Sequence, residues 1–183
     1  WYCRIRLYDG SRRDLPTNCR DKSAAQARLT QLAREQVHEA GRQHVNDDAA
    51  LYFRTVVRLP SSIKHARAYV SALGWYRLFV NGQDMTGNAL VPRFTPLQKV
   101  VEYQTYDVSN VLRSGENIIS IAVGDGRFRG RLGFLGTRCT YGAQLAALAQ
   151  IEVVLDDGQE FLLKTDTDWQ VGPGRIVGSD PQY

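Results

Sequence analysis

From residue 49 onward, apolar and polar side chains alternate with a period of two in one short stretch after another. Alternation of this kind is typical of strands that bury one face. The predicted strands cover residues 51–59, 66–71, 75–81, 100–107, 117–124, 146–156, 160–165 and 168–171. Many short strands with almost no helix between them predict an all-β fold, an antiparallel β-sandwich of jelly-roll type.

Turn residues separate the predicted strands. Asn81-Gly82 and Asp157-Gly158 each suit the two-residue hairpin turn, which requires positive φ angles. Ser114-Gly115 predicts a tight stop before the strand that follows. The sandwich should therefore contain at least two hairpins between neighbouring strands.

Aromatic residues indicate how two strands face the core. Trp75 and Tyr76 are adjacent, so their side chains must point to opposite faces of the strand. One of the pair is therefore predicted to be a half-exposed platform or an interface residue. Trp169, in the last short strand, is predicted to lie in the core.

The first 45 residues have a different pattern. Residues 2–8 alternate up to an Asp9-Gly10 turn, which predicts a strand with no recognisable partner nearby. Residues 21–44 carry an apolar stripe at helical spacing and predict the one helix of the chain. Asp21 or Ser23 could cap its N-terminus, because both side chains accept hydrogen bonds from free backbone amides.

The distribution of charge also differs between residues 1–45 and the rest of the chain. The chain has 183 residues, 43% of them hydrophobic, and a net charge of +4. Residues 1–45 hold nine basic and five acidic side chains, which accounts for the whole excess, and the remainder is neutral. A neutral sandwich without a zinc-finger or helix-turn-helix pattern argues against nucleic acid as a partner.

No run of 18 apolar residues and no signal-peptide pattern is present in the sequence, so no membrane partner is expected. The chain starts at Trp1 and not at Met. We therefore expect it to be an excerpt of a longer protein whose N-terminus and any targeting signal are missing, which leaves the localisation open.

The cysteine and histidine residues do not have the spacing of a metal-binding site. The three cysteines are Cys3, Cys19 and Cys139, an odd number without a CxxC pair. Unpaired buried thiols are favoured over a Cys3–Cys19 disulfide, which would require an exported parent. The three histidines have no cysteine or carboxylate at ligand spacing, so a zinc site is not expected.

Residues 123–141 break the alternation directly after a strong strand. This stretch carries five glycines, four arginines, one acid and three aromatic residues. A long loop in a compact sandwich is usually functional, and this chemistry suits a sugar: guanidinium and carboxylate groups bond vicinal hydroxyls while an aromatic face covers the ring. The candidate sugar-binding residues are Trp75, Asp125, Arg127, Phe128, Arg129 and Arg131.

Two other interpretations of the same loop stay open. Its arginines could form a contact surface for another domain. Alternatively Gly124-Asp125-Gly126 could be an ordinary turn, with the Asp125 carboxylate bonding nearby amides and the arginines solvated.

Four segments in order carry a family resemblance: ARAYVSALGWYRLFVNG (66–82), YQTYDV (103–108), LRSGEN (112–117) and VGDGRFRGRLGF (123–134). From about residue 51 to 183 the chain resembles the N-terminal β-sandwich domain of bacterial α-L-rhamnosidases, the glycoside hydrolase family 78 enzymes. The resemblance implies a galactose-binding-like sandwich that serves as a non-catalytic carbohydrate-binding or accessory domain. The parent enzyme would hydrolyse terminal α-L-rhamnose with inversion.

The resemblance also implies partners and a cofactor. In this family the catalytic carboxylates belong to a downstream (α/α)6 barrel of the same chain, so no catalytic residues are expected within these 183 residues. L-rhamnose-containing glycans or glycosides would be the ligands. Related rhamnose-binding modules use calcium, which makes calcium a candidate cofactor and Asp125 a candidate ligand for it.

The chain departs from the family pattern at two places. Phe128 stands where a tryptophan is common, and Arg93 and Pro96 replace a glycine and an acid. The Asn81-Gly82 turn and the later Glu116-Asn117 pair also fit the sugar-binding sandwich of a β-galactosidase-like enzyme. That family, and a purely structural interdomain module packing on the catalytic barrel, remain the alternatives.

Three segments are expected. Residues 1–20 would be a lead-in strand or the end of a preceding fibronectin-like β module, since residues 1–15 weakly resemble the closing strand of one. Residues 21–45 would be a linker helix, and residues 46–183 the accessory β-sandwich domain.

Overall fold

The structure is a computed structural model that describes part of the chain. It covers the backbone of Cys3–Arg6 and Arg12–Leu15, and then residues 49–87, 90–134, 136–176 and 178–179. The helix predicted over residues 21–44 lies outside the described residues, and the predicted division into three segments stays a prediction.

The described elements follow the chain in this order: β1 (Cys3–Arg6), β2 (Arg12–Leu15), β3 (Leu51–Leu59), β4 (Ile63–Leu73), β5 (Trp75–Val80), β6 (Gln83–Asp84), β7 (Gln104–Asp107), β8 (Gly115–Gly124), α2 (Gly126–Arg129), β9 (Ala146–Leu155), β10 (Glu160–Lys164) and β11 (Gln170–Pro173).

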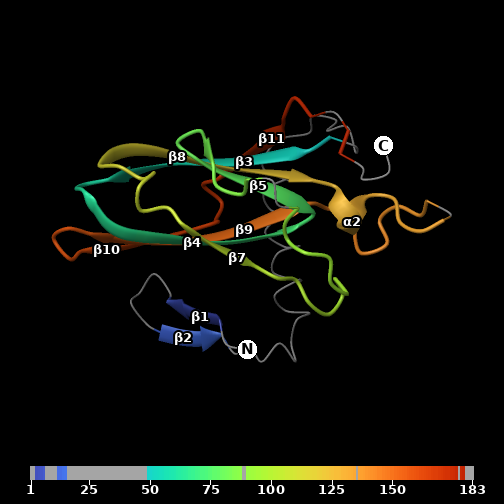
Figure 1. Cartoon of the computed structure of the whole chain (residues 1–183), viewed down its shortest axis with the longest axis horizontal. Coiled ribbons are helices and arrows are strands. Elements are labelled where there is room, and N and C mark those ends of the chain that lie inside the picture. The colour runs from blue at the N-terminus through green and yellow to red at the C-terminus, as the bar shows by residue number, and fades with distance from the viewer. Residues whose placement is uncertain are drawn as a thin grey trace.

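Strands β3 to β11 form two antiparallel sheets. One has the order β11-β3-β8-β5-β6 and the other the order β10-β9-β4-β7. Figure 1 shows the two sheets stacked as layers, with α2 at one end of the stack. The predicted antiparallel β-sandwich is therefore confirmed. We call the end of the sandwich that carries α2 the α2 end.

Two predicted strand boundaries were wrong for local reasons. The strand predicted over 100–107 begins only at Gln104, because the Lys99 and Val100 amides donate to the Pro96 carbonyl, in a turn. The last strand begins at Gln170, because Asp166 accepts the amide of Asp168 and holds a turn before it. In both cases the residues alternate as in a strand but form a turn, and the alternation of apolar and polar side chains does not predict that turn.

The core lies between the sheets and takes side chains from both. Phe53, Leu78 and Ile121 of the five-stranded sheet are fully buried, as are Ala68 and Ile151 of the four-stranded sheet. Burial of this apolar surface is the main stabilising contribution to such a fold. The inward positions are the alternate ones that the sequence pattern indicated.

The aromatic predictions for β5 and for Trp169 are confirmed. Tyr76 is 2% exposed, whereas its neighbour Trp75 is half-buried on the other face. The Tyr76 hydroxyl donates to the Val70 carbonyl at 3.0 Å and lies 2.9 Å from the Tyr106 hydroxyl. Burial, with the Tyr106 contact, raises the pKa of Tyr76 above its ordinary value, so this phenol stays protonated. Trp169 is buried in the main core.

The two hairpin predictions have different outcomes. Asn81 and Gly82 have φ angles of 51° and 83° and join β5 to β6 as predicted. The β9–β10 hairpin instead has three residues in its loop, because the Gly158 amide donates to the Leu155 carbonyl and Leu155 pairs with Gln159. Of its two predicted turn residues only Gly158 has a positive φ. This geometry is a tight turn followed by one left-handed residue.

A buried amide network fixes the end of the sandwich opposite α2. Asn117 is 0% exposed, accepts from the Asn81 side chain at 2.8 Å and donates to the carbonyls of Arg113 and Gly115. Asn81 in turn accepts the amide of Ile118. The Asn-Gly turn and the later asparagine, which suggested two sugar-binding families, are therefore residues that build the sandwich and do not face a ligand.

We expect Asn117→Ala to lower the free energy of unfolding by about 1–3 kcal/mol, because it leaves buried backbone groups without partners. Urea unfolding of the chain, followed by tryptophan fluorescence, measures the loss. Asn110→Ala, at an exposed turn, is the control and should leave the midpoint unchanged. Equal midpoints for both variants would contradict this role of the network.

The N-terminal strand has a partner that the sequence did not reveal. β1 pairs with β2 in an antiparallel register that places Cys3 opposite Leu15 and Arg6 opposite Arg12. The expectation of a strand without a nearby partner was therefore wrong, because residues 12–15, three of which are charged, form a second strand that apolar–polar alternation does not predict. Within the residues that the structure describes, no helix has the length and apolar character needed to cross a membrane.

Candidate functional site

The segment predicted as a long loop starts with a helical turn that packs against β5. β8 ends at Gly124, which pairs with Trp75, and α2 begins two residues later at Gly126. Gly126 has a φ of +50°, and a Cβ there would lie 2.8 Å from the Trp75 backbone nitrogen. Only glycine fits this close approach. Trp75 and α2 are thus held together by backbone packing.

Asp125 forms a buried ion pair at the start of α2. Its carboxylate is 0% exposed and accepts from Arg129 at 2.6 Å and from Arg138 at 2.8 Å, one arginine on each oxygen. Arg129 follows Asp125 by one helical turn, a spacing that favours such a pair. A buried carboxylate is stable only when it is paired in this way.

The same group of residues joins segments that are distant in sequence. Nη2 of Arg129, which also contacts Asp125, donates to the Ala49 carbonyl at 3.0 Å, just before β3. The Arg129 carbonyl accepts the Cys139 amide at 2.8 Å, and the Asp125 amide donates to the Ser179 hydroxyl at 3.0 Å. We refer to buried Asp125 with its two partners, buried Arg129 and half-buried Arg138, as the buried triad. It fixes the start of β3, the loop and the segment around Ser179 to one another.

The geometry does not fit calcium at Asp125. Both carboxylate oxygens already accept from guanidinium groups, and two adjacent cations repel a third. In the part of the chain that the structure describes, no group of three or more His, Cys, Asp or Glu side chains could hold a metal ion. The arrangement around Asp125, the candidate calcium ligand, therefore suits an internal ion pair and not a calcium site.

Phe128 points into the protein and is 3% exposed. It belongs to a small apolar cluster with Leu73, Leu97 and Ala146. A Cβ on Gly142 would lie 2.6 Å from Cζ at the tip of the Phe128 ring, so Gly142 closes that edge of the ring. Phe128 cannot present a stacking face to a sugar, because its side chain is buried within the protein.

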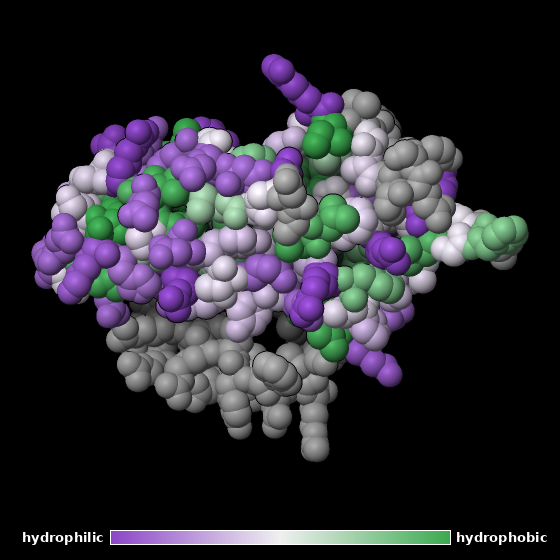
Figure 2. Space-filling model, in the orientation of Figure 1, coloured by the Kyte–Doolittle hydropathy of each residue, from purple (hydrophilic) through white to green (hydrophobic). Residues whose placement is uncertain are grey.

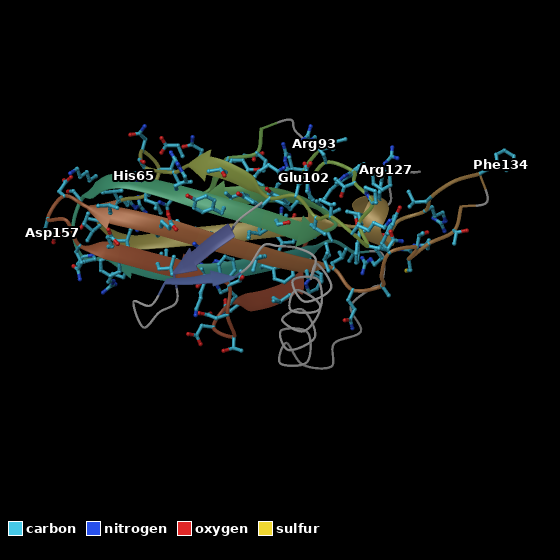
Figure 3. The ribbon with its side chains drawn as sticks, turned by 90° about the horizontal axis from the view of Figure 1, so that it is seen from below. His65, Arg93, Glu102, Arg127, Phe134 and Asp157 are labelled. Atoms are coloured by element: carbon cyan, nitrogen blue, oxygen red, sulfur yellow. The ribbon has the colours of Figure 1, made fainter. Side chains whose placement is uncertain are left out.

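An exposed group of side chains lies over this cluster. The Arg127 guanidinium is 5.0 Å from the centre of the Phe94 ring, and Phe94 meets Tyr141 edge to face at 6.0 Å. Arg93 next to it forms a bidentate ion pair with Glu102 at 3.0 and 3.2 Å. Figure 3 shows Arg93, Glu102 and Arg127 toward the α2 end, away from His65 and Asp157. Arg93, which departs from the family pattern, thus has a partner of its own.

A shallow recess separates Trp75 from Phe94 and Arg127. It has room for about 10 Å³, roughly one water molecule, and its floor is formed by Ala72, Leu97 and other apolar residues. Sites that enclose a small ligand need several hundred cubic ångströms. A sugar at this place would lie on the open surface between Trp75 and Phe94.

The six sequence-predicted residues therefore separate into two groups. The structure buries Asp125, Phe128 and Arg129, whereas Arg127 is exposed and Trp75 and Arg131 are half-buried. The sequence analysis missed Phe94 and Tyr141 next to Arg127, and Arg138 as the second partner of Asp125. The i, i+4 spacing of Asp125 and Arg129 was the signal that could have indicated an internal ion pair.

Cys139 differs from its prediction. It is a free thiol, as predicted, but it is exposed and not buried. It has a positive φ of 58° and lies in the loop after the helix, where its amide donates to the Arg129 carbonyl. The side chains of Cys3 and Cys19 lie outside the described residues.

A two-layer antiparallel arrangement of sheets, with arginine and aromatic side chains gathered at one end, defines the class of the protein as an all-β sandwich module. The family model described as the α-L-rhamnosidase N-terminal domain matches residues 61–181. The chain belongs to this family. The membership decides against the β-galactosidase-like alternative.

Relatives and solved structures agree with this assignment. An α-L-rhamnosidase from Streptomyces avermitilis is 38% identical over 72% of this chain, and one from Formosa agariphila is 34% identical over 68%. The chain spans only 13% and 14% of those two relatives.

Among solved structures, the native α-L-rhamnosidase of Aspergillus terreus matches with a TM-score of 0.69 and 33% identity, over 72% of this chain and 15% of that one. The Streptomyces avermitilis enzyme complexed with L-rhamnose matches with a TM-score of 0.69 and 37% identity, over 73% and 13%. In each case the matched part is a small portion of a much larger chain, as expected of an accessory domain.

Proposed function

We propose that this chain is the accessory β-sandwich of a larger α-L-rhamnosidase, and that its exposed surface of Trp75, Phe94 and Arg127 contacts the sugar of the substrate. The observation that carries the proposal is the Arg127 guanidinium held over the Phe94 ring, with Trp75 across the recess. One relative of known structure is complexed with L-rhamnose, which supports a rhamnoside as the ligand class.

The chemistry of this surface suits a rhamnosyl ring. The ring has a C–H face and a methyl group, which aromatic side chains cover, and vicinal hydroxyls, which a guanidinium bonds in a planar fork. Stacking on Phe94 orients Arg127 and leaves its outer donors directed to solvent. Arg131, half-buried in the loop two residues after α2 ends, is the second arginine that we place near this surface.

Hydrolysis itself is assigned to the rest of the enzyme. Glycosidic cleavage requires two carboxylates across the scissile bond. Near the candidate surface, Asp125 is buried between two arginines and Glu102 pairs with Arg93. We therefore place the acid and base in the (α/α)6 barrel of the parent enzyme, as in the family, with the sandwich forming one side of the substrate-binding region.

Calorimetric titration of the chain with L-rhamnose tests the proposal. We expect millimolar affinity, because an open surface buries little of the sugar, and about tenfold weaker binding for Trp75→Ala and for Arg127→Ala. Arg58→Ala, an exposed arginine at the far end of β3, is the matched control. Added calcium should change nothing. Absence of heat at millimolar sugar, or equal binding by all variants, would reject the sugar contact.

A further inference from the structure

A short hairpin projects from the α2 end of the sandwich. Leu132 and Thr137 exchange backbone hydrogen bonds of 2.9 and 3.1 Å, and the Gly136 amide donates to the Gly133 carbonyl at 3.2 Å. Phe134 at the tip is 105% exposed, and Figure 3 shows it at the far end of the hairpin, away from both sheets. We call this turn, closed by Leu132 and Thr137 and carrying Phe134, the Phe134 hairpin.

Other exposed apolar side chains lie at the same end. Phe94, 49% exposed, is stacked by Arg127 of α2. Ile176, 45% exposed, is held next to Ala50 by a backbone hydrogen bond and so lies beside the start of β3. Figure 2 shows hydrophobic colour on the projecting hairpin, at the place where Figure 1 shows the loop beyond α2. Gathered apolar groups of this kind mark interaction surfaces, whereas single ones do not.

The base of the Phe134 hairpin is rigid although its tip is exposed. Arg138, directly after the hairpin, donates to buried Asp125, and the Cys139 amide donates to the Arg129 carbonyl. The buried triad therefore sets the direction in which Phe134 points. A contact group that is held in place before binding loses less conformational entropy on association.

We infer that the Phe134 hairpin is the element by which the sandwich docks on the catalytic part of the same enzyme, with Phe134 inserted into an apolar pocket of that part. The inference rests on the proposed function. Two observations select this partner. The matched α-L-rhamnosidases extend far beyond the part that this chain covers, and Ser179, bound to the Asp125 amide, brings the C-terminal side of the described sandwich to the α2 end, from which the hairpin projects.

Charge defines the chemistry of the partner surface. Residues 123–141 carry four arginines and one acid, and that acid is buried. The outward charge around the hairpin is therefore positive. We expect the receiving pocket to be apolar with a rim of aspartate or glutamate, which steers docking and fixes its register.

The test uses the full-length parent enzyme carrying Phe134→Ser, studied by calorimetric unfolding and amide hydrogen exchange. Because Phe134 is fully exposed in the sandwich itself, the variant should fold normally. We expect the unfolding transition of the sandwich to fall by about 3–6 °C and the Leu132 and Thr137 amides to lose protection. Phe134→Leu keeps an apolar side chain and should therefore retain most of the native unfolding temperature and amide protection. Val56→Thr, at an exposed position on β3, is the control.

Each other outcome rejects the inference. Unchanged unfolding together with unchanged exchange means that nothing covers Phe134. A change from dimer to monomer without loss of protection within the monomer means that a second copy is the partner. A raised KM for a rhamnoside without any change in unfolding means that Phe134 contacts sugar. Trp75→Ala tests the proposed function separately, because its loss of L-rhamnose binding does not depend on docking.

Discussion

Replacing Asp125 with alanine is expected to lower the free energy of unfolding by about 3–5 kcal/mol, the usual loss when one partner of a buried ion pair is removed. Arg129, which is 7% exposed, would be left as a buried cation, and Arg138 would lose its partner as well. For a chain of this size the melting temperature should fall by roughly 10 °C. Thermal unfolding followed by circular dichroism measures the effect.

Two further variants make this test specific. Asp168→Ala removes an exposed aspartate near Trp169 and should change stability by less than about 0.5 kcal/mol. Adding Arg129→Met to Asp125→Ala should recover part of the loss, because it removes one of the two uncompensated charges. If Asp125→Ala instead kept the native melting temperature and lost only L-rhamnose binding, the carboxylate would face the sugar and the buried triad would be wrongly assigned.

The contrast between Asp125 and Arg127 shows how far the sequence could lead. The strands were predictable because alternation and turn chemistry are local, and β3 was predicted with its observed limits of Leu51 and Leu59. The burial of Asp125 was not predictable in this way. It depends on Arg138, 13 residues further on, and on an arginine whose other bond reaches a carbonyl 80 residues earlier in the chain.

The candidate surface of Trp75, Phe94 and Arg127 was likewise predictable from the sequence only in part. The composition of residues 123–141 indicated the α2 end, but composition cannot distinguish an arginine that supports the loop from one that faces solvent. Arg127 and Arg129 are two residues apart on a single helical turn, so their side chains point in different directions. Phe94 comes from the connection before β7, and only the fold brings it to Arg127.

The residues at the α2 end of the sandwich therefore form an inner layer, which supports the fold, and an outer layer, which we propose contacts the ligand. The buried triad and Phe128 hold α2 against β5 and set the direction of the Phe134 hairpin. Trp75, Phe94 and Arg127 then form the outer surface. Substitutions in the inner layer should therefore act on stability first, whereas substitutions of the exposed Phe94 and Arg127 side chains should act mainly on binding.

Phe128 allows the sharpest comparison of the two layers. Phe128→Ala is expected to cost about 3–5 kcal/mol in the free energy of unfolding, because it opens a cavity between α2 and the cluster of Leu73, Leu97 and Ala146. Phe134→Ala, the same change on an exposed phenylalanine of the same loop, should cost less than about 0.5 kcal/mol in the isolated chain. Chemical unfolding of both variants measures the difference.

Enlarging the same side chain tests how tightly it is enclosed. Phe128→Trp should destabilise the chain by about 1–3 kcal/mol, since Gly142 closes one side of the ring and leaves no room for a second ring. A tryptophan that left stability unchanged and strengthened L-rhamnose binding would mean that this position faces the ligand. We expect both Phe128→Ala and Phe128→Trp to lose stability, and sugar binding to fall only in proportion to the unfolded fraction. That result would establish Phe128 as a core residue that supports the exposed Arg127 surface.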